Sequence, residues 1–105
     1  MNNRLEQLQQ FAENDPNDPF NLYALALECQ KCDIPRALTT FNSLIATHPQ
    51  YVATYYQLGK LYQQIGEHSL AIKIFNAGIS VAFGIGDHKT HRELQSALRE
   101  LEEEL

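Results

Sequence analysis

The sequence predicts an all-α protein. Apolar residues recur at i, i+3, i+4 and i+7 along most of the 105-residue chain, which is the spacing of one face of an α-helix. No stretch of useful length alternates between apolar and polar residues, as a half-buried strand would. Proline and glycine interrupt the pattern at short intervals. The predicted helices are therefore joined by short turns, and consecutive helices should run antiparallel.

The first two predicted helices flank the turn NDPND at residues 14–18. Asp18 is expected to cap the second helix, because a carboxylate there accepts hydrogen bonds from free backbone N–H groups of the first turn. Pro19 fits that first turn, where its missing N–H is not needed. The apolar stripe of the first helix is Leu5, Leu8 and Phe11, and that of the second is Leu22, Leu25, Ala26 and Cys29.

A tight turn at residues 33–35 precedes the third helix, which is expected to end before Pro49. The fourth helix ends at Gly66. The fifth runs into GIGD at residues 84–87, and Asp87 is expected to cap the sixth. The stripes of these four helices are Ala37, Phe41, Leu44 and Ile45; Val52, Tyr55, Leu58 and Tyr62; Ala71, Phe75, Gly78, Ile79 and Ala82; and Leu94, Leu98, Leu101 and Leu105.

The helices repeat at a nearly constant spacing. The third and fifth superpose at an offset of 34 residues, and the second and fourth at 33. The matched pairs are Ala37 with Ala71, Phe41 with Phe75, Leu44 with Gly78, Leu25 with Leu58, Ala26 with Gly59 and Cys29 with Tyr62. A helix pair that recurs about every 34 residues indicates a helical repeat stack rather than a simple bundle.

The second copy of the unit reads YxxLGxxY at residues 55–62, followed by AxxxF at residues 71–75. This resembles the tetratricopeptide repeat, with tyrosine in place of its usual first tryptophan. The first copy, LxxLAxxC at residues 22–29 followed by AxxxF at residues 37–41, matches less closely. Phe83 stands where the family has proline, so the fifth helix is expected to run on by about one turn.

The resemblance implies a single tetratricopeptide-like domain over residues 1–105, in which antiparallel helix pairs stack as a short right-handed superhelix of about six helices. Its expected parts are an N-terminal half-repeat helix at 1–16, a first repeat at 19–49, a second repeat at 50–84 and a C-terminal capping helix at 87–105. Each repeat must bury its apolar face on a neighbour, so two repeats need the flanking half-repeats.

Gly59 lies in the middle of the fourth helix, where glycine costs roughly 1 kcal/mol relative to alanine. In the repeat register it is the small residue at which two helices of a pair come closest, beside Ala71 and Phe75. We therefore expect Gly59→Leu to over-pack the fold, at a cost of ~1–3 kcal/mol, and Gly59→Ala to be mild.

The resemblance implies a protein interaction module rather than an enzyme. The first helix of each pair would line a concave groove for a peptide or helix of a partner protein, and Tyr and apolar side chains beside long amides suit such a ligand. The side chains expected to face the groove are Phe20, Tyr23, Leu27, Gln30 and Lys31 from the second helix and Tyr56, Lys60, Gln63 and Gln64 from the fourth. The alternative is that they only cover the neighbouring half-repeats.

One known kind of groove is not expected. Relatives that grip a C-terminal carboxylate use a clamp of Lys, Asn and Arg, whereas Tyr23 and Leu27 occupy the positions of its first Lys and Asn. A second functional hypothesis is a self-associating structural subunit. Its contact would be the C-terminal helix, with the apolar residues Ile85, Leu94, Leu98, Leu101 and Leu105.

Charge and composition exclude several classes of function. A net charge of −5 leaves no surplus of Lys and Arg to neutralise phosphates, which argues against nucleic acid as a partner. The start MNNRLEQLQQ lacks the apolar core of a signal peptide, and no run approaches the ~18 apolar residues of a membrane span. Two cysteines without an export signal fit a reducing compartment. We expect a cytoplasmic protein that binds neither nucleic acid nor membrane.

Metal and catalytic chemistry have little support in the sequence. Cys29-x2-Cys32 with His88-x2-His91 would complete a Cys2His2 zinc set, but a lone CxxC is weak evidence and Cys29 occupies a core position. No glycine-rich phosphate loop and no nucleophile with a base and an orienting group are recognisable. We expect no cofactor, no metal ligand and no catalytic residue.

Overall fold

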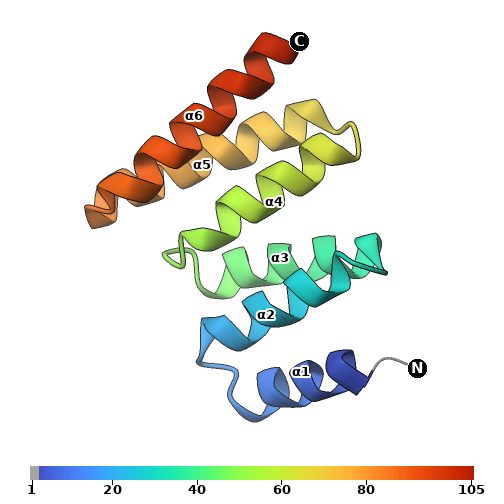
Figure 1. Cartoon of the computed structure of the whole chain (residues 1–105). Coiled ribbons are helices and arrows are strands. Elements are labelled where there is room, and N and C mark those ends of the chain that lie inside the picture. Colours follow the sequence, from blue (N-terminus) through green and yellow to red (C-terminus); the bar gives the residue numbers. More distant parts are fainter. Residues whose placement is uncertain (1–2) are drawn as a thin grey trace. The chain divides into compact units, whose positions relative to one another are not determined.

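The computed structural model describes residues 3–105, and this part of the chain forms six α-helices and no strand (Figure 1). The helices are α1 (Asn3–Asn14), α2 (Pro19–Cys29), α3 (Ile34–Thr47), α4 (Ala53–Gln64), α5 (His68–Ile85) and α6 (His88–Glu104). The all-α prediction is confirmed.

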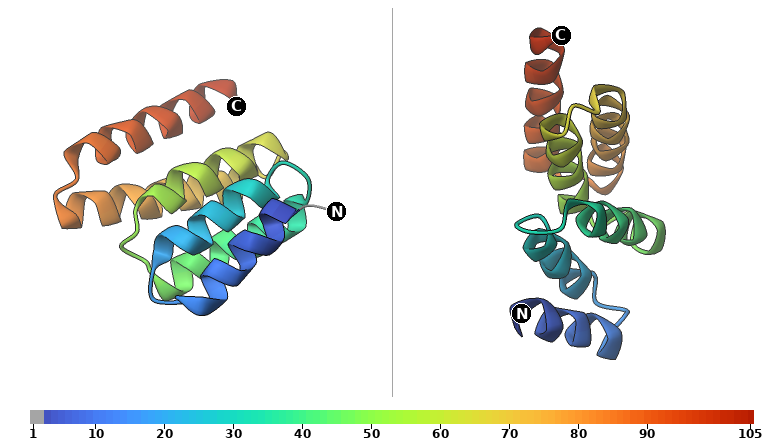
Figure 2. Two further views of the ribbon diagram at one scale, coloured as in Figure 1. Left: turned by 60° about the horizontal axis from the view of Figure 1, so that its bottom comes forward. Right: turned by 90° about the vertical axis from the view of Figure 1, so that its right-hand side faces the viewer.

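The chain divides into two compact units, Met1–His48 and Pro49–Leu105. The first unit contains α1, α2 and α3, and the second contains α4, α5 and α6. Consecutive helices pack against each other within each unit, and in the second unit α4 also contacts α6. Figure 2 shows α4 and α6 on the same side of α5.

Three aspartates begin helices. The Oδ1 atoms of Asp18, Asp33 and Asp87 accept hydrogen bonds from the backbone N–H groups of Phe20, Arg36 and Thr90, at N···O distances of 3.0, 3.2 and 3.1 Å. The predictions for Asp18 and Asp87 are confirmed. The prediction of a tight turn at residues 33–35 is wrong, because Asp33 is itself the cap and Pro35 already lies in the first turn of α3.

The C-terminal ends of α4 and α5 use glycine in the left-handed region. Gly66 has φ +84° and Gly86 has φ +76°, a conformation that costs L-residues with a Cβ atom about 1 kcal/mol or more. α5 continues to Ile85, about one turn beyond the position equivalent to the end of α3. The expected extension past Phe83 is therefore confirmed.

The core of the first unit is built from all three of its helices. The buried apolar residues are Leu8 and Ala12 of α1, Leu25, Ala26 and Cys29 of α2, and Ala37, Phe41 and Leu44 of α3. The prediction for Phe11 is wrong, because its side chain is 52% exposed and Ala12 is buried instead. Within this unit α1 packs on α2, and Leu8 and Ala12, at i and i+4, face that neighbour. The predicted spacing of i and i+3, Leu8 with Phe11, does not.

The core of the second unit departs from the predicted stripes in all three helices, and in α5 the predicted Ile79 is only half-buried. Its buried apolar residues are Tyr55, Leu58 and Leu61 of α4, Ala71, Phe75 and Ala82 of α5, and Leu94, Ala97 and Leu101 of α6. Leu61 rather than Tyr62 is fully buried in α4. In α6 Ala97 replaces the half-buried Leu98, and Leu105 is 68% exposed. The face of α6 is displaced because this helix packs on both α5 and α4.

Tyr55 occupies the position at which the repeat motif usually has tryptophan. Its side chain is only 2% exposed, and its hydroxyl donates a hydrogen bond to the Pro49 carbonyl oxygen at 2.6 Å. Burial raises the pKa of the Tyr55 phenol above its ordinary value of 10.0. The ring therefore fills the core while the hydroxyl fixes the segment that enters α4.

Two glycines allow close crossings in the second unit. A Cβ atom on Gly59 would lie 2.3 Å from Cε1 of Phe75, and one on Gly78 would lie 2.5 Å from Cβ of Tyr55. The inferred role of Gly59, a close approach to Phe75, is confirmed. Even a single methyl group overlaps the ring, so Gly59→Ala is expected to destabilise the unit rather than to be mild.

By length and composition α5 could cross a membrane, so the expectation that no segment is long and apolar enough is wrong. The helix carries Lys73 and Asn76. Its buried residues, Ala71, Phe75, Gly78 and Ala82, form one stripe, and α5 packs against α4 and α6. A helix that packs one face against two others meets the same length and composition criterion.

Candidate functional site

The α2 part of the predicted binding surface belongs to the first unit. Phe20, directly after the capped start of the helix, is 58% exposed. Leu27 and Gln30 are half-buried, and Lys31 is exposed and forms an ion pair with Glu28 (Nζ to Oε2, 3.1 Å). Phe20 is thus the residue of this group that offers a large apolar surface to a partner.

Tyr23 contributes to the core as well as to the surface. Its ring meets the ring of Phe41 edge-on, with centroids 6.5 Å apart and an interplanar angle of 63°. Phe41 is fully buried on α3, so Tyr23 joins the first helix of the pair to the second. Removal of the Tyr23 ring would weaken the unit in addition to any effect on binding.

Two residues of the α4 part of the predicted surface, Tyr56 and Gln63, meet α6 within the second unit. Gln63 donates a hydrogen bond from Nε2 to Oε2 of Glu104 at 2.9 Å, and its Oε1 is buried without a partner in the described chain. Lys60 is half-buried and Gln64 is exposed. Gln63 therefore holds the end of α6 against α4. This agrees with the alternative in which a predicted groove residue covers a neighbouring half-repeat instead of binding a ligand.

Tyr56 lines a hollow of about 190 Å³ between α4 and α6. The other lining residues are Glu93, Ser96, Ala97 and Glu100, all from α6. They lie at i, i+3, i+4 and i+7, which places them on one face of that helix. Sequence reasoning assigned α6 to capping and to possible self-association and missed this face, although the spacing itself was visible.

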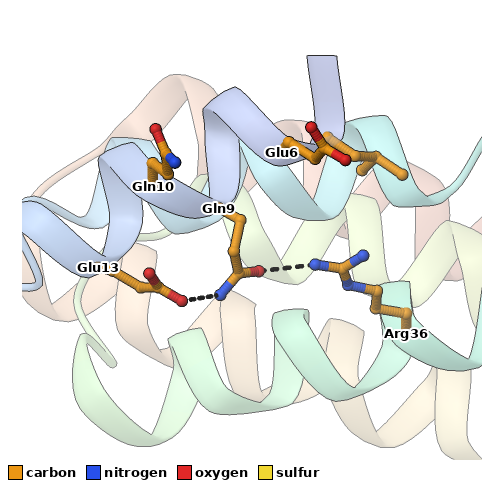
Figure 3. A pocket seen from close by; sticks show the side chains of 6 residues that line it. Glu6, Gln9, Gln10, Glu13 and Arg36 are labelled. Atoms are coloured by element: carbon orange, nitrogen blue, oxygen red, sulfur yellow. Dashed lines mark hydrogen bonds between the residues drawn. The ribbon is translucent and has the colours of Figure 1, made fainter. Parts of the chain in front are cut away.

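A second hollow, of about 330 Å³, lies in the first unit between α1 and Arg36 of α3 (Figure 3). Arg36 Nη2 donates to Oε1 of Gln9 at 2.7 Å, and Gln9 Nε2 donates to Oε1 of Glu13 at 2.9 Å. Its other lining residues are Leu5, Glu6 and Gln10. The chain of hydrogen bonds ties α1 to α3, and no sequence pattern pointed to it.

The two cysteines differ in environment. Cys29 is fully buried and Cys32 is exposed. Burial raises the pKa of the Cys29 thiol above its ordinary value of 9.0, which keeps it protonated and unreactive at neutral pH. Within residues 3–105 no group of three or more His, Cys, Asp and Glu side chains could hold a metal ion.

Comparisons with known proteins identify the family. No protein-family model matches the chain, and no curated protein matches it with significance. The solution structure of a tetratricopeptide repeat domain protein from Salinibacter ruber is 47% identical, with a TM-score of 0.79, and the match covers 84% of this chain and 90% of that one. A crystal structure of the tetratricopeptide repeat domain protein from the same organism gives 45% identity, a TM-score of 0.76, and coverage of 81% and 97%. The chain belongs to the tetratricopeptide repeat family.

A more distant structure shares the fold. A protein from Bordetella parapertussis has 24% identity and a TM-score of 0.82, with coverage of 99% of this chain and 91% of that one. Tetratricopeptide repeat domains are helical repeat modules that generally take part in protein–protein interaction and are typically not catalytic.

Proposed function

We propose that this chain is an adaptor that binds a partner protein through the first helix of each repeat, α2 in the first unit and α4 in the second, and that α6 contributes beside α4 within the second unit. The observation that carries the proposal is the hollow beside Tyr56, which is open to a ligand although α4 and α6 pack against each other. In the first unit, the exposed ring of Phe20 on α2 is a separate candidate anchor. Aromatic anchors of this kind contribute much of the affinity in protein interfaces.

The proposed partner is a protein, in keeping with the family, and the proposal includes neither an enzymatic activity nor a cofactor. A location in the cytoplasm and the absence of nucleic-acid and membrane partners are part of the same proposal. The cysteine usage supports the location, the net charge of −5 argues against nucleic acid, and the packing of α5 against α4 and α6 argues against a membrane span.

The test compares capture of partners by the wild type and by a Phe20→Ala/Tyr56→Ala variant. Both side chains lie outside the fully buried core, so the variant is expected to remain folded. The control is Phe83→Ala, which removes a ring that is 72% exposed on α5, outside the first helices. Partners that bind the wild type and the control but not the double variant support the proposal. Equal capture by all three proteins would refute it.

Self-association through α6 is the second candidate. Ile85 and Leu105 are 46% and 68% exposed and are free to meet another copy. Leu94 and Leu101, in contrast, are fully buried within the unit and contribute nothing to such a contact. Light scattering over a range of concentrations tests this candidate, and a monomer at the highest concentration would rule it out.

A further inference from the structure

The hollow between α4 and α6 combines an aromatic ring with two carboxylates. Glu93 and Glu100 are seven residues apart on the same face of α6, so their Cα atoms lie about 10.5 Å apart along the helix axis. Ser96 and Ala97 lie between them. Because these two side chains are small, the space between the carboxylates stays open and the ring of Tyr56 forms the opposite wall.

Among the residues that the structure describes, the two carboxylates have no partner. Within residues 3–105 neither Glu93 nor Glu100 takes part in a hydrogen bond or ion pair. Lys60, one turn along α4 from Tyr56, is not among the residues that line the hollow. No cationic side chain of the described residues lines the hollow, and its two acidic groups are therefore available to a cation from outside.

The hollow is too small for a typical small-molecule ligand but large enough for part of one side chain. Its volume of about 190 Å³ lies below the ~300 Å³ at which small-molecule sites usually begin. A guanidinium group fits this lining best, because its planar fork of N–H groups donates hydrogen bonds to carboxylates and its face stacks on an aromatic ring.

We propose that this hollow receives an arginine side chain of the partner protein, between the Glu93 and Glu100 carboxylates and the Tyr56 ring. The inference rests on the proposed function and adds the chemistry of the bound segment to it. The partner is thus basic where it meets the second unit, which matches the chain's net charge of −5.

The experiment is a titration of nitrogen-15-labelled protein with the blocked tripeptide acetyl-Ala-Arg-Ala-amide, followed by amide chemical shifts. The matched peptide has citrulline in place of arginine, which keeps the shape and removes the charge. We expect saturable shifts of the Tyr56, Ser96 and Ala97 amides with the arginine peptide, and at least roughly five-fold weaker binding of the citrulline peptide.

Two double variants test the residues. Glu93→Gln/Glu100→Gln should weaken binding of the arginine peptide roughly five-fold, as expected for the loss of two exposed ionic contacts. Glu102→Gln/Glu103→Gln changes the net charge equally on exposed residues outside the hollow, and should bind like the wild type. Equal binding by both double variants, or equal binding of both peptides, would overturn the proposal.

The outcomes separate this proposal from the broader one. If partner capture depended on Phe20 and Tyr56 while the arginine and citrulline peptides bound equally, the adaptor function would stand and the arginine site would be refuted. If the arginine peptide bound as expected while no captured partner depended on these two residues, the adaptor proposal alone would fail. Amide chemical shifts of the residues that line the hollow could instead change with protein concentration in the absence of peptide. That result would show that a second copy of the chain occupies the hollow, and it would overturn the arginine assignment.

Discussion

Gly59→Ala tests the packing of the second unit with one methyl group. The added Cβ atom would lie 2.3, 2.6 and 2.8 Å from three carbon atoms of the Phe75 ring, whereas ordinary contact begins at 3.4 Å. The ring is fully buried on α5 and cannot swing into solvent. Either the ring must leave its position or α4 and α5 must separate by about 1 Å.

Two opposing terms set the size of the effect. Over-packing of a well-packed core costs ~1–3 kcal/mol, and the overlap with three ring carbons places this substitution near the upper end. Alanine recovers roughly 1 kcal/mol of helix propensity. We therefore expect a net loss of about 2 kcal/mol in the free energy of unfolding, which lowers the Tm of a domain of this size by about 10 °C.

The measurement is thermal and urea unfolding followed by far-ultraviolet circular dichroism. Gly84→Ala is the matched control, because Gly84 lies inside α5 and a Cβ atom there meets nothing within 4 Å. The control should gain roughly 0.5–1 kcal/mol. If Gly59→Ala were as stable as Gly84→Ala, the close approach of α4 to Phe75 would be wrong, and with it the register of the repeat.

Three further predictions concern titratable groups. Folding raises the pKa of Tyr55 above 10.0, so the stability that the protonated phenol contributes is present below that pH and is lost as the pH rises. Tyr55→Phe should lower the free energy of unfolding by about 1 kcal/mol at neutral pH. In urea unfolding, the stability of this variant should also fall less steeply at alkaline pH than that of the wild type. Hydrogen bonds from the Thr90 backbone N–H and hydroxyl lower the pKa of Asp87 below 3.8. The stability that the Asp87 carboxylate contributes is therefore present above that pH and lost in acid. Asp87→Asn should be less stable than the wild type at neutral pH but not at pH 2 to 3. A thiol reagent should modify Cys32 quickly in the native protein and Cys29 only after unfolding, and two equally fast thiols would contradict the burial of Cys29.

The fold could be predicted from the sequence because several independent signals coincide. The apolar spacing, the capping residues Asp18 and Asp87, and the 34-residue offset all require the same helices. Each signal is local or strictly periodic, and local physical chemistry decides such features. The order and approximate limits of the helices follow directly.

The exact buried face was less predictable, because it depends on which neighbours a helix meets. Leu98 and Ala97 are adjacent on α6, and the larger residue was the natural choice for the core. In the structure Ala97 is buried because α6 packs on both α5 and α4, and close approach favours the smaller side chain. Phe11 and Ala12 of α1 show the same exchange. Hydrophobicity alone therefore identifies the helix face only to within about one residue.

The candidate site was harder to predict than the fold, since its parts come from helices distant in sequence. The repeat register identified Tyr56 as a surface residue. It does not predict which side chains of α6 lie near Tyr56, because α6 lies outside the two complete repeats. Glu93 and Glu100 lie more than thirty residues from Tyr56, and only the packing of α4 on α6 brings them to one hollow. Peptide binding by the nine residues first assigned to a groove remains a prediction.

The helix α6 combines a stabilising face and a candidate recognition face at neighbouring positions. Leu94, Ala97 and Leu101 are buried against the rest of the unit, while Glu93 and Glu100, each next in sequence to a buried leucine, line the hollow. Because the two carboxylates are exposed and have no internal partner in the described chain, neutralising them should weaken binding without removing any contact of the core. Glu93→Gln/Glu100→Gln should therefore unfold at the same temperature as the wild type while it binds the arginine peptide less tightly. A fall in Tm that matched the loss of binding would show instead that the carboxylates serve the fold.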